Sequence, residues 1–143
     1  MFIYEAQKLL RENKATPSIL LKESIEKIEE GQKLGAFITT NMDQAIELAA
    51  KQDEMLKSKQ DGNLPPLFGI PLALKDNIYT ENLRTTAGSL FWKDFVPTQD
   101  AQVVIKLKSS GALLVGKTNM HEIALGVTSN NPHYGPCLNP HDD

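Results

Sequence analysis

The sequence predicts an α/β fold in which a mixed β-sheet is flanked by helices. Runs with helical periodicity occupy most of the first sixty residues, and short apolar runs of strand length lie at residues 36–40, 70–74 and 112–115. Helices and strands that alternate in this way are typical of a layered α/β structure with some parallel strand pairing. The chain has 143 residues, of which 41% are hydrophobic and 23% charged, as expected for one globular domain.

The first two predicted helices are amphipathic. Residues 4–12 place apolar side chains at helical spacing. The second helix is expected to begin at Thr16-Pro17, because a threonine hydroxyl can cap the first turn and proline is tolerated at the first helical position. We expect Gly31 to end this helix in a left-handed conformation.

A strand and a third helix complete the first part of the chain. Residues 36–40 are apolar and β-prone, and Asp43 is expected to cap a helix that ends in the polar stretch 57–63. Nothing in residues 1–62 suggests chemistry, so we interpret them as a helical scaffold.

Residues 63–143 are predicted to form the core of the sheet and the loops around it. A loop with three prolines leads into a strand that ends at Lys75. Asp100 is expected to cap a helix that ends at Gly111. Residues 112–115 have the length and branching of a buried strand.

The last part of the chain is rich in turns. Asn119 and Glu122 have the spacing of a capping box, which predicts a short helix that stops at Gly126. The turn at residues 128–131 carries hydroxyl and amide side chains that can contact a ligand.

One segment has the residue pattern of a nucleotide-binding loop, although its other features do not fit such a loop. Residues 111–118 fit the phosphate-loop pattern G-x-x-x-x-G-K-[ST]. That chemistry needs an open loop between the glycines, whereas the four residues here are Ala-Leu-Leu-Val and favour a buried strand. We therefore interpret the segment as the end of a helix followed by a core strand.

Composition excludes several classes of protein. The formal net charge of −3 gives no basic stripe for nucleic acid, and no run is long and apolar enough for a membrane span. The single cysteine, Cys137, rules out an internal disulfide and fits a reducing compartment, so we expect a cytoplasmic protein. His121-Glu122 begins a zinc-protease pattern, but Leu125 stands where the second histidine belongs, and no metal site is predicted.

Lys75 is the candidate catalytic residue. It ends the apolar run of residues 70–74, where burial would disfavour the charged ammonium. A lysine so placed can act as a general base at neutral pH. The alternative is that Lys75 extends from the end of the strand into solvent, and the residues alone leave both interpretations open.

Four blocks in order resemble the amidase signature family. They are residues 68–77, 85–89, 111–120 and 135–140, and the similarity extends more weakly over the N-terminal helices. The stretch 120–131 is more similar to the small-amide hydrolases of the family, such as indoleacetamide hydrolases, than to the A subunit of the aspartyl/glutamyl-tRNA amidotransferase. The fold implied is the N-terminal part of the amidase-signature fold.

The resemblance implies a Ser–cisSer–Lys mechanism for the hydrolysis of a carboxylic amide. The lysine that Lys75 matches accepts a proton, through a bridging serine, from the serine that attacks the carbonyl. The family uses no metal and no organic cofactor. It also implies that the turn at 128–131 borders the substrate cavity, which adds Thr128, Ser129, Asn130 and Asn131 as candidate substrate-binding residues.

The chain departs from the family pattern in one respect. Both catalytic serines of the family lie in a Gly/Ser-rich segment that none of these 143 residues matches. We therefore expect a truncated, single amidase domain that is inactive alone, with a missing C-terminal portion or a homodimer covering an open sheet edge. The alternatives are a fragment of the amidotransferase A subunit, which would not itself bind nucleic acid, and a non-catalytic interaction module.

Overall fold

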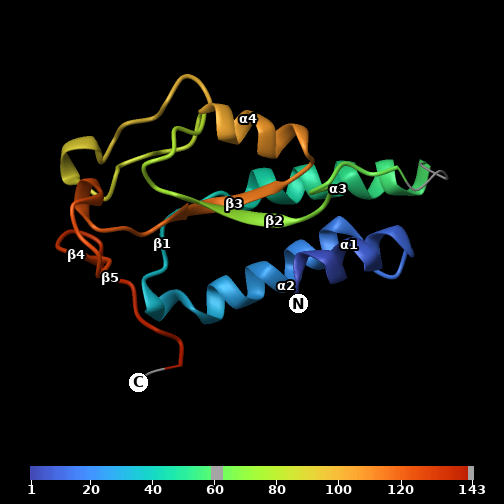
Figure 1. Ribbon diagram of the computed structural model, residues 1–143, viewed down its shortest axis with the longest axis horizontal. Coiled ribbons are helices and arrows are strands. Elements are labelled where there is room, and N and C mark those ends of the chain that lie inside the picture. The colour runs from blue at the N-terminus through green and yellow to red at the C-terminus, as the bar shows by residue number, and fades with distance from the viewer. Residues whose placement is uncertain (59–62, 142–143) are drawn as a thin grey trace.

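The computed structural model describes residues 1–58 and 63–141 and contains a three-stranded mixed sheet. Its strands are β1 (Phe37–Thr40), β2 (Pro71–Lys75) and β3 (Leu113–Thr118), in the order β1-β3-β2. The central strand β3 pairs antiparallel with β1 and parallel with β2. The predicted mixed sheet with some parallel pairing is therefore confirmed (Figure 1).

Helices cover both faces of this sheet (Figure 1). On one face lie α1 (Ile3–Arg11), α2 (Pro17–Glu30) and α3 (Met42–Ser58), and on the other lies α4 (Gln102–Ser109). The remaining elements are short: the 3-10 helices Gln32–Leu34, Leu90–Trp92 and Glu122–Ala124, and the paired strands β4 (Asn130–Asn131) and β5 (Gly135–Pro136).

The core is built on both sides of β3. Leu113 and Val115 pack against buried side chains of α2 and α3, while Leu114 packs with Leu74 of β2 and Val104 of α4. Alternate residues of a strand point to opposite faces, so a strand covered on both faces needs an unbroken apolar run. This explains why residues 112–115 lack the polar alternation of a half-buried strand.

Two of the predicted helix ends, at Thr16 and at Gly111, are confirmed. Thr16 caps α2, since its hydroxyl accepts a hydrogen bond from the Ile19 amide at 3.3 Å, and Pro17 is the first helical residue. Gly111 ends α4 with a φ of +87°. Gly31 has a φ of −87°, so the predicted left-handed cap is wrong there, and Gly35 adopts that conformation after the following 3-10 helix.

Three further predicted caps are wrong. The helix α3 begins at Met42, so Asp43 lies inside its first turn. Ala101 is the N-cap residue of α4, because the Asp100 carboxylate instead accepts from the Glu81 amide at 2.7 Å and from Lys108 Nζ at 2.6 Å.

The predicted capping box at Asn119 is the third. The Asn119 amide donates to the carbonyls of Gly35 and Gly135 at 2.9 and 3.0 Å, and so joins segments far apart in the sequence. Glu122 starts a single 3-10 turn instead of a short α-helix.

The predicted division of the chain at residue 62 falls outside the described residues and stays a prediction. The strand β1 from the first part pairs with β3 from the second, so both parts contribute to one sheet. Within residues 1–58 and 63–141, no helix combines the length and the apolar character that a membrane crossing requires.

Candidate active site

Lys75 lies at the carboxyl end of β2 and is exposed. The prediction that apolar neighbours bury it is wrong. Along this edge strand Leu74 is buried against α4, whereas Ala73 and Lys75 are exposed, because they alternate with it. Burial therefore gives no support to a role as a base, and that role rests on the family resemblance.

Asp76, the next residue, is fully buried and holds the loop of small residues beside Lys75. Its carboxylate oxygen Oδ2 accepts from the amide and the hydroxyl of Thr86 at 2.9 and 2.5 Å, and from the Gly88 amide at 3.5 Å. Its main-chain carbonyl accepts from the Ala87 amide at 3.0 Å. These bonds fix residues 86–88 against the end of β2.

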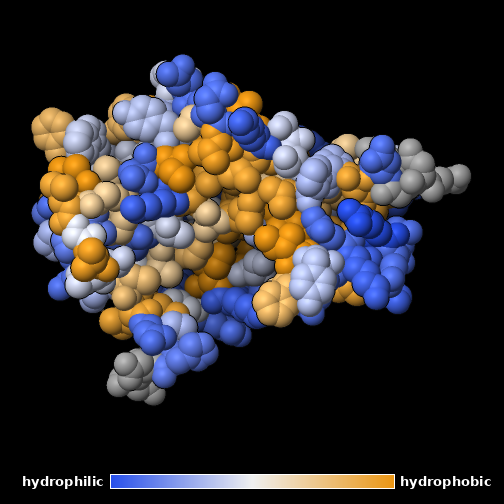
Figure 2. All heavy atoms as spheres, viewed as in Figure 1, coloured by the Kyte–Doolittle hydropathy of each residue, from blue (hydrophilic) through white to orange (hydrophobic). Residues whose placement is uncertain are grey.

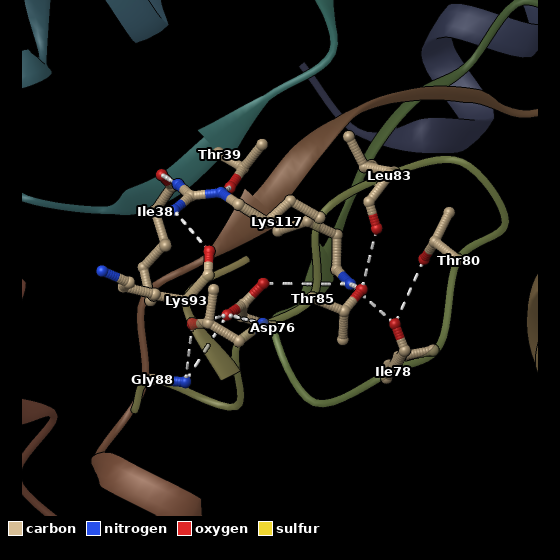
Figure 3. A network of polar contacts seen from close by, with 12 residues as sticks. Ile38, Thr39, Asp76, Ile78, Thr80, Leu83, Thr85, Gly88, Lys93 and Lys117 are labelled. Atoms are coloured by element: carbon tan, nitrogen blue, oxygen red, sulfur yellow. Dashed lines mark hydrogen bonds and ion pairs between the residues drawn. The ribbon is translucent and has the colours of Figure 1, made fainter. Parts of the chain in front are cut away.

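Lys117 is a buried lysine, and it was not among the predicted site residues. Its Nζ donates to the Ile78 carbonyl and to the Thr85 hydroxyl, both at 2.6 Å, and lies 3.9 Å from Asp76 Oδ1 (Figure 3). Burial lowers the pKa of Lys117 to about 8, and the nearby Asp76 carboxylate partly opposes that shift. A usable signal was present, because Lys117 continues the strand predicted at residues 112–115.

The contacts of Lys117 also show whether residues 111–118 form a phosphate-binding loop. Residues 113–118 are the strand β3, and the Lys117 ammonium is bonded to protein oxygens. The interpretation of this motif as structural is confirmed by its position in the sheet.

The turn at residues 128–131 has an exposed part and a buried part. Thr128 and Asn130 are exposed, and the Thr128 hydroxyl lies 3.5 Å from His121 Nδ1 and accepts from the Asn130 amide. Ser129 is half-buried and has a left-handed φ of 51°. Thr128 and Asn130 are thus the accessible members of the predicted substrate-binding set.

Asn131 is 2% exposed, and both polar atoms of its side chain form hydrogen bonds within the chain. Its Nδ2 donates to the carbonyls of Gly88 and Met120 at 2.7 and 2.8 Å. Its Oδ1 accepts from the amides of His133 and Tyr134 at 2.8 and 3.0 Å. These contacts make Asn131 a clamp that holds the turn in place.

Gly88 brings the two predicted parts of the site together. Its amide donates to Asp76 beside Lys75, and its carbonyl accepts from Asn131 of the turn. Its φ is +68°, and a Cβ there would lie 2.7 Å from Asn131 Nδ2. Only glycine fits this close approach without displacing the clamp.

Two further features of the site were missed in the sequence. Glu122 lies 3.1 Å from His133 Nε2, and hydrogen bonds, first from Ser89 and then from His133, lower the pKa of its carboxyl group. Arg84 donates to the Ile38 carbonyl at 2.9 Å and the Thr39 hydroxyl at 3.1 Å, which ties this loop to β1. No local pattern signals contacts between residues so distant in the sequence.

Left-handed backbone is concentrated around the site. Ala87, Ile123 and Ala124 have φ values of 52°, 52° and 59°, and the Ile123 amide donates to the Ala87 carbonyl at 2.8 Å. Such a conformation costs about 1–3 kcal/mol for a non-glycine residue and is typical of functional loops. Among the residues described, no three His, Cys, Asp or Glu side chains gather as metal ligands would.

Lys75 thus ends a strand beside a loop of left-handed backbone that buried polar side chains hold in place. The chain belongs to the Amidase family: the sequence profile of that family matches residues 20–143. The predicted resemblance is thereby confirmed.

Individual relatives agree with this assignment. The chain is 44% identical over 135 residues to the A subunit of the glutamyl-tRNA(Gln) amidotransferase from Exiguobacterium sp. strain AT1b, a match that covers 94% of this chain and 27% of the relative. It is similar to a crystal structure of an amidase, with a TM-score of 0.85 and 37% identity over 97% of this chain and 31% of that one. The peptide amidase of Stenotrophomonas maltophilia gives a TM-score of 0.83 and 32% identity over 96% of this chain and 29% of that one.

The chain therefore spans 27% of the length of the Exiguobacterium relative. The fold is that of the amidases over almost all of the chain, as predicted.

Proposed function

We propose that the chain contributes the lysine base of an amidase that hydrolyses a carboxylic amide at its C–N bond. The observation that carries the proposal is the position of Lys75. It is exposed, so a substrate can reach it, and it is the last residue of the strand β2, whose end is fixed by the buried Asp76. Membership of the Amidase family supports the reaction class.

In this mechanism Lys75 accepts a proton, through a bridging serine, from the attacking serine. The attack forms an acyl-enzyme and expels ammonia or an amine, and water then releases the carboxylic acid. Ser89 is not the nucleophile, because it is 3% exposed and its hydroxyl accepts from the Phe91 amide. Under the family resemblance both serines belong to a segment that this sequence does not match.

The test uses a chimera, because the chain matches only part of its relatives. This chain replaces the matched segment of the Exiguobacterium protein, and ammonia release from a primary amide and from glutamine is measured. We expect Lys75→Ala to reduce kcat/KM by about 10²–10⁴-fold, the usual contribution of a general base. The matched control is Lys106→Ala, an exposed lysine on α4.

The 143 residues assayed alone are expected to hydrolyse no amide in a way that Lys75→Ala reduces. A chimera whose activity survives Lys75→Ala would contradict the assignment of the base. A chimera that is inactive while the intact relative is active under the same conditions would favour a non-catalytic interaction module.

The second candidate function is that of an amidotransferase A subunit. The 44% identity to such a protein favours it. In that case the chimera should deliver ammonia to a charged tRNA only when the partner subunits are added. Hydrolysis of simple amides that needs no partner would instead favour a small-amide hydrolase.

Two features of the surface support the compartment and the partner that we propose. Cys137 is exposed and unpaired, which fits the reducing cytoplasm. The strand β2 pairs only with β3 among the described residues, so a further portion of the domain or a second copy of the chain would cover its free edge.

A further inference from the structure

Lys117 and Asp76 form a buried charge pair behind the loop that borders Lys75. Both side chains have 0% exposure, and the ammonium nitrogen lies 3.9 Å from Asp76 Oδ1. That distance makes an ion pair without a direct hydrogen bond. Within the described part of the chain, Asp76 Oδ1 has no hydrogen-bond partner, so the ammonium is its principal stabilising contact.

The two oxygens of Asp76 have different roles. Oδ1 faces the Lys117 ammonium (Figure 3). Oδ2 accepts three hydrogen bonds from Thr86 and Gly88. An ionised carboxylate accepts from several donors at once. Removing the countercharge would leave the buried Asp76 carboxylate without its ion pair, which weakens the anchor that it provides for the loop.

We propose that Lys117 is a positioning residue, which pairs with the buried Asp76 carboxylate and thereby fixes residues 86–88 beside Lys75. The importance of that loop rests on the proposed function, whereas the physical link from Lys117 to the loop does not. Ala87 supports the link, because its left-handed backbone is held by the Asp76 carbonyl and by the Ile123 amide. A strained loop of this kind keeps its geometry only while its anchors remain.

The charge of Lys117 can be followed through its own contacts. It is protonated below its pKa of about 8 and neutral above, and Thr85 accepts a hydrogen bond from its Nζ. The methyl resonances of Thr85 and Thr86 should therefore change with a midpoint near pH 8 in the 143-residue chain. Asp76 is the titratable group that pairs with this ammonium among the described residues.

The test compares the chain with its Lys117→Met variant, which keeps a long side chain and removes the charge, and with Lys106→Met as the matched control. Lys117→Met should abolish the threonine titration near pH 8 and reduce the hydrogen-exchange protection of the Thr86 and Gly88 amides by about tenfold. Lys106→Met should behave like the parent. A Lys117 that acts only on its direct contacts predicts that Thr85 titrates near pH 8 and that Thr86 does not.

Asp76→Asn provides a second variant should Lys117→Met fail to fold. Since the Asp76 charge raises the pKa of Lys117, its removal should move the threonine midpoint to lower pH. A parent chain whose loop does not titrate, a titration that persists in Lys117→Met, or a midpoint unmoved in Asp76→Asn would overturn the proposal. None of these measurements depends on catalysis, so they remain interpretable even if Lys75 proves not to be the base.

Discussion

At the scale of single residues, three buried polar side chains hold the loops of the site in place. Asp76, Lys117 and Asn131 are all buried, and each bonds to backbone or side-chain groups of the surrounding loops. A buried polar group destabilises the fold unless it is bonded, so these three can occupy the interior only because the loops supply their partners.

Asn131 offers a direct test at this scale. Asn131→Ala removes the partners of two carbonyls and two amides and should destabilise the chain by about 1–3 kcal/mol. The neighbouring Asn130→Ala is the matched control, since that side chain is exposed and should change the free energy of unfolding by less than about 0.5 kcal/mol. Urea unfolding measures both, and equal effects would show that Asn131 is not a clamp.

At the scale of elements, the two parallel strands have opposite environments. The central strand β3 is covered by helices on both faces, whereas β2 lies at the edge of the sheet. The lysine in each strand has the same environment as the strand. Lys117 of β3 is buried, and Lys75 of β2 is exposed. The sheet order thus decides which of the two amines meets solvent.

The core role of β3 is tested by Leu113→Ala. Leu113 is 0% exposed, and its truncation should cost about 2–5 kcal/mol, because it loses buried contacts and leaves a cavity. Leu125→Ala is the control, since Leu125 is 79% exposed and should change stability by no more than about 0.5 kcal/mol. A small loss at Leu113 in chemical denaturation would mean that β3 is not the centre of the core.

At the scale of the whole molecule, the side of the sheet at β2 carries an apolar surface. Figure 2 shows hydrophobic side chains gathered between α4 and the N-terminal helices, with a hollow beside them. A pocket of about 180 Å³ lies there, and Phe2, Leu20, Ile70 and Pro71 are among its lining residues. An exposed apolar surface beside a free strand edge is typical of an interface.

The chain on its own is therefore expected to self-associate through β2. Ala73→Lys places a charge on the exposed face of this strand and should weaken association by about tenfold. Sedimentation equilibrium of the parent and the variant measures this, with Lys106→Ala as a control that should associate like the parent. A parent chain that is monomeric at high concentration, or an Ala73→Lys variant that associates equally, would contradict the prediction.

The family, the α/β class and the approximate position of each main helix and strand could be predicted from the sequence. These depend on local periodicity, on turn residues and on blocks of sequence such as residues 68–77, which persist whatever the surroundings. Thr16 capped its helix as predicted because both partners lie within four residues.

Contacts between distant segments of the folded chain set which polar side chains are buried and what they bind. The Asp100 carboxylate and the Asn119 Nδ2 bind partners at least eight residues away and do not form the predicted caps. Lys117 lies in a core strand and pairs with Asp76, which follows the neighbouring strand. The physical reason is that burial and charge pairing depend on which strands become neighbours, and periodicity along the chain carries no record of that order.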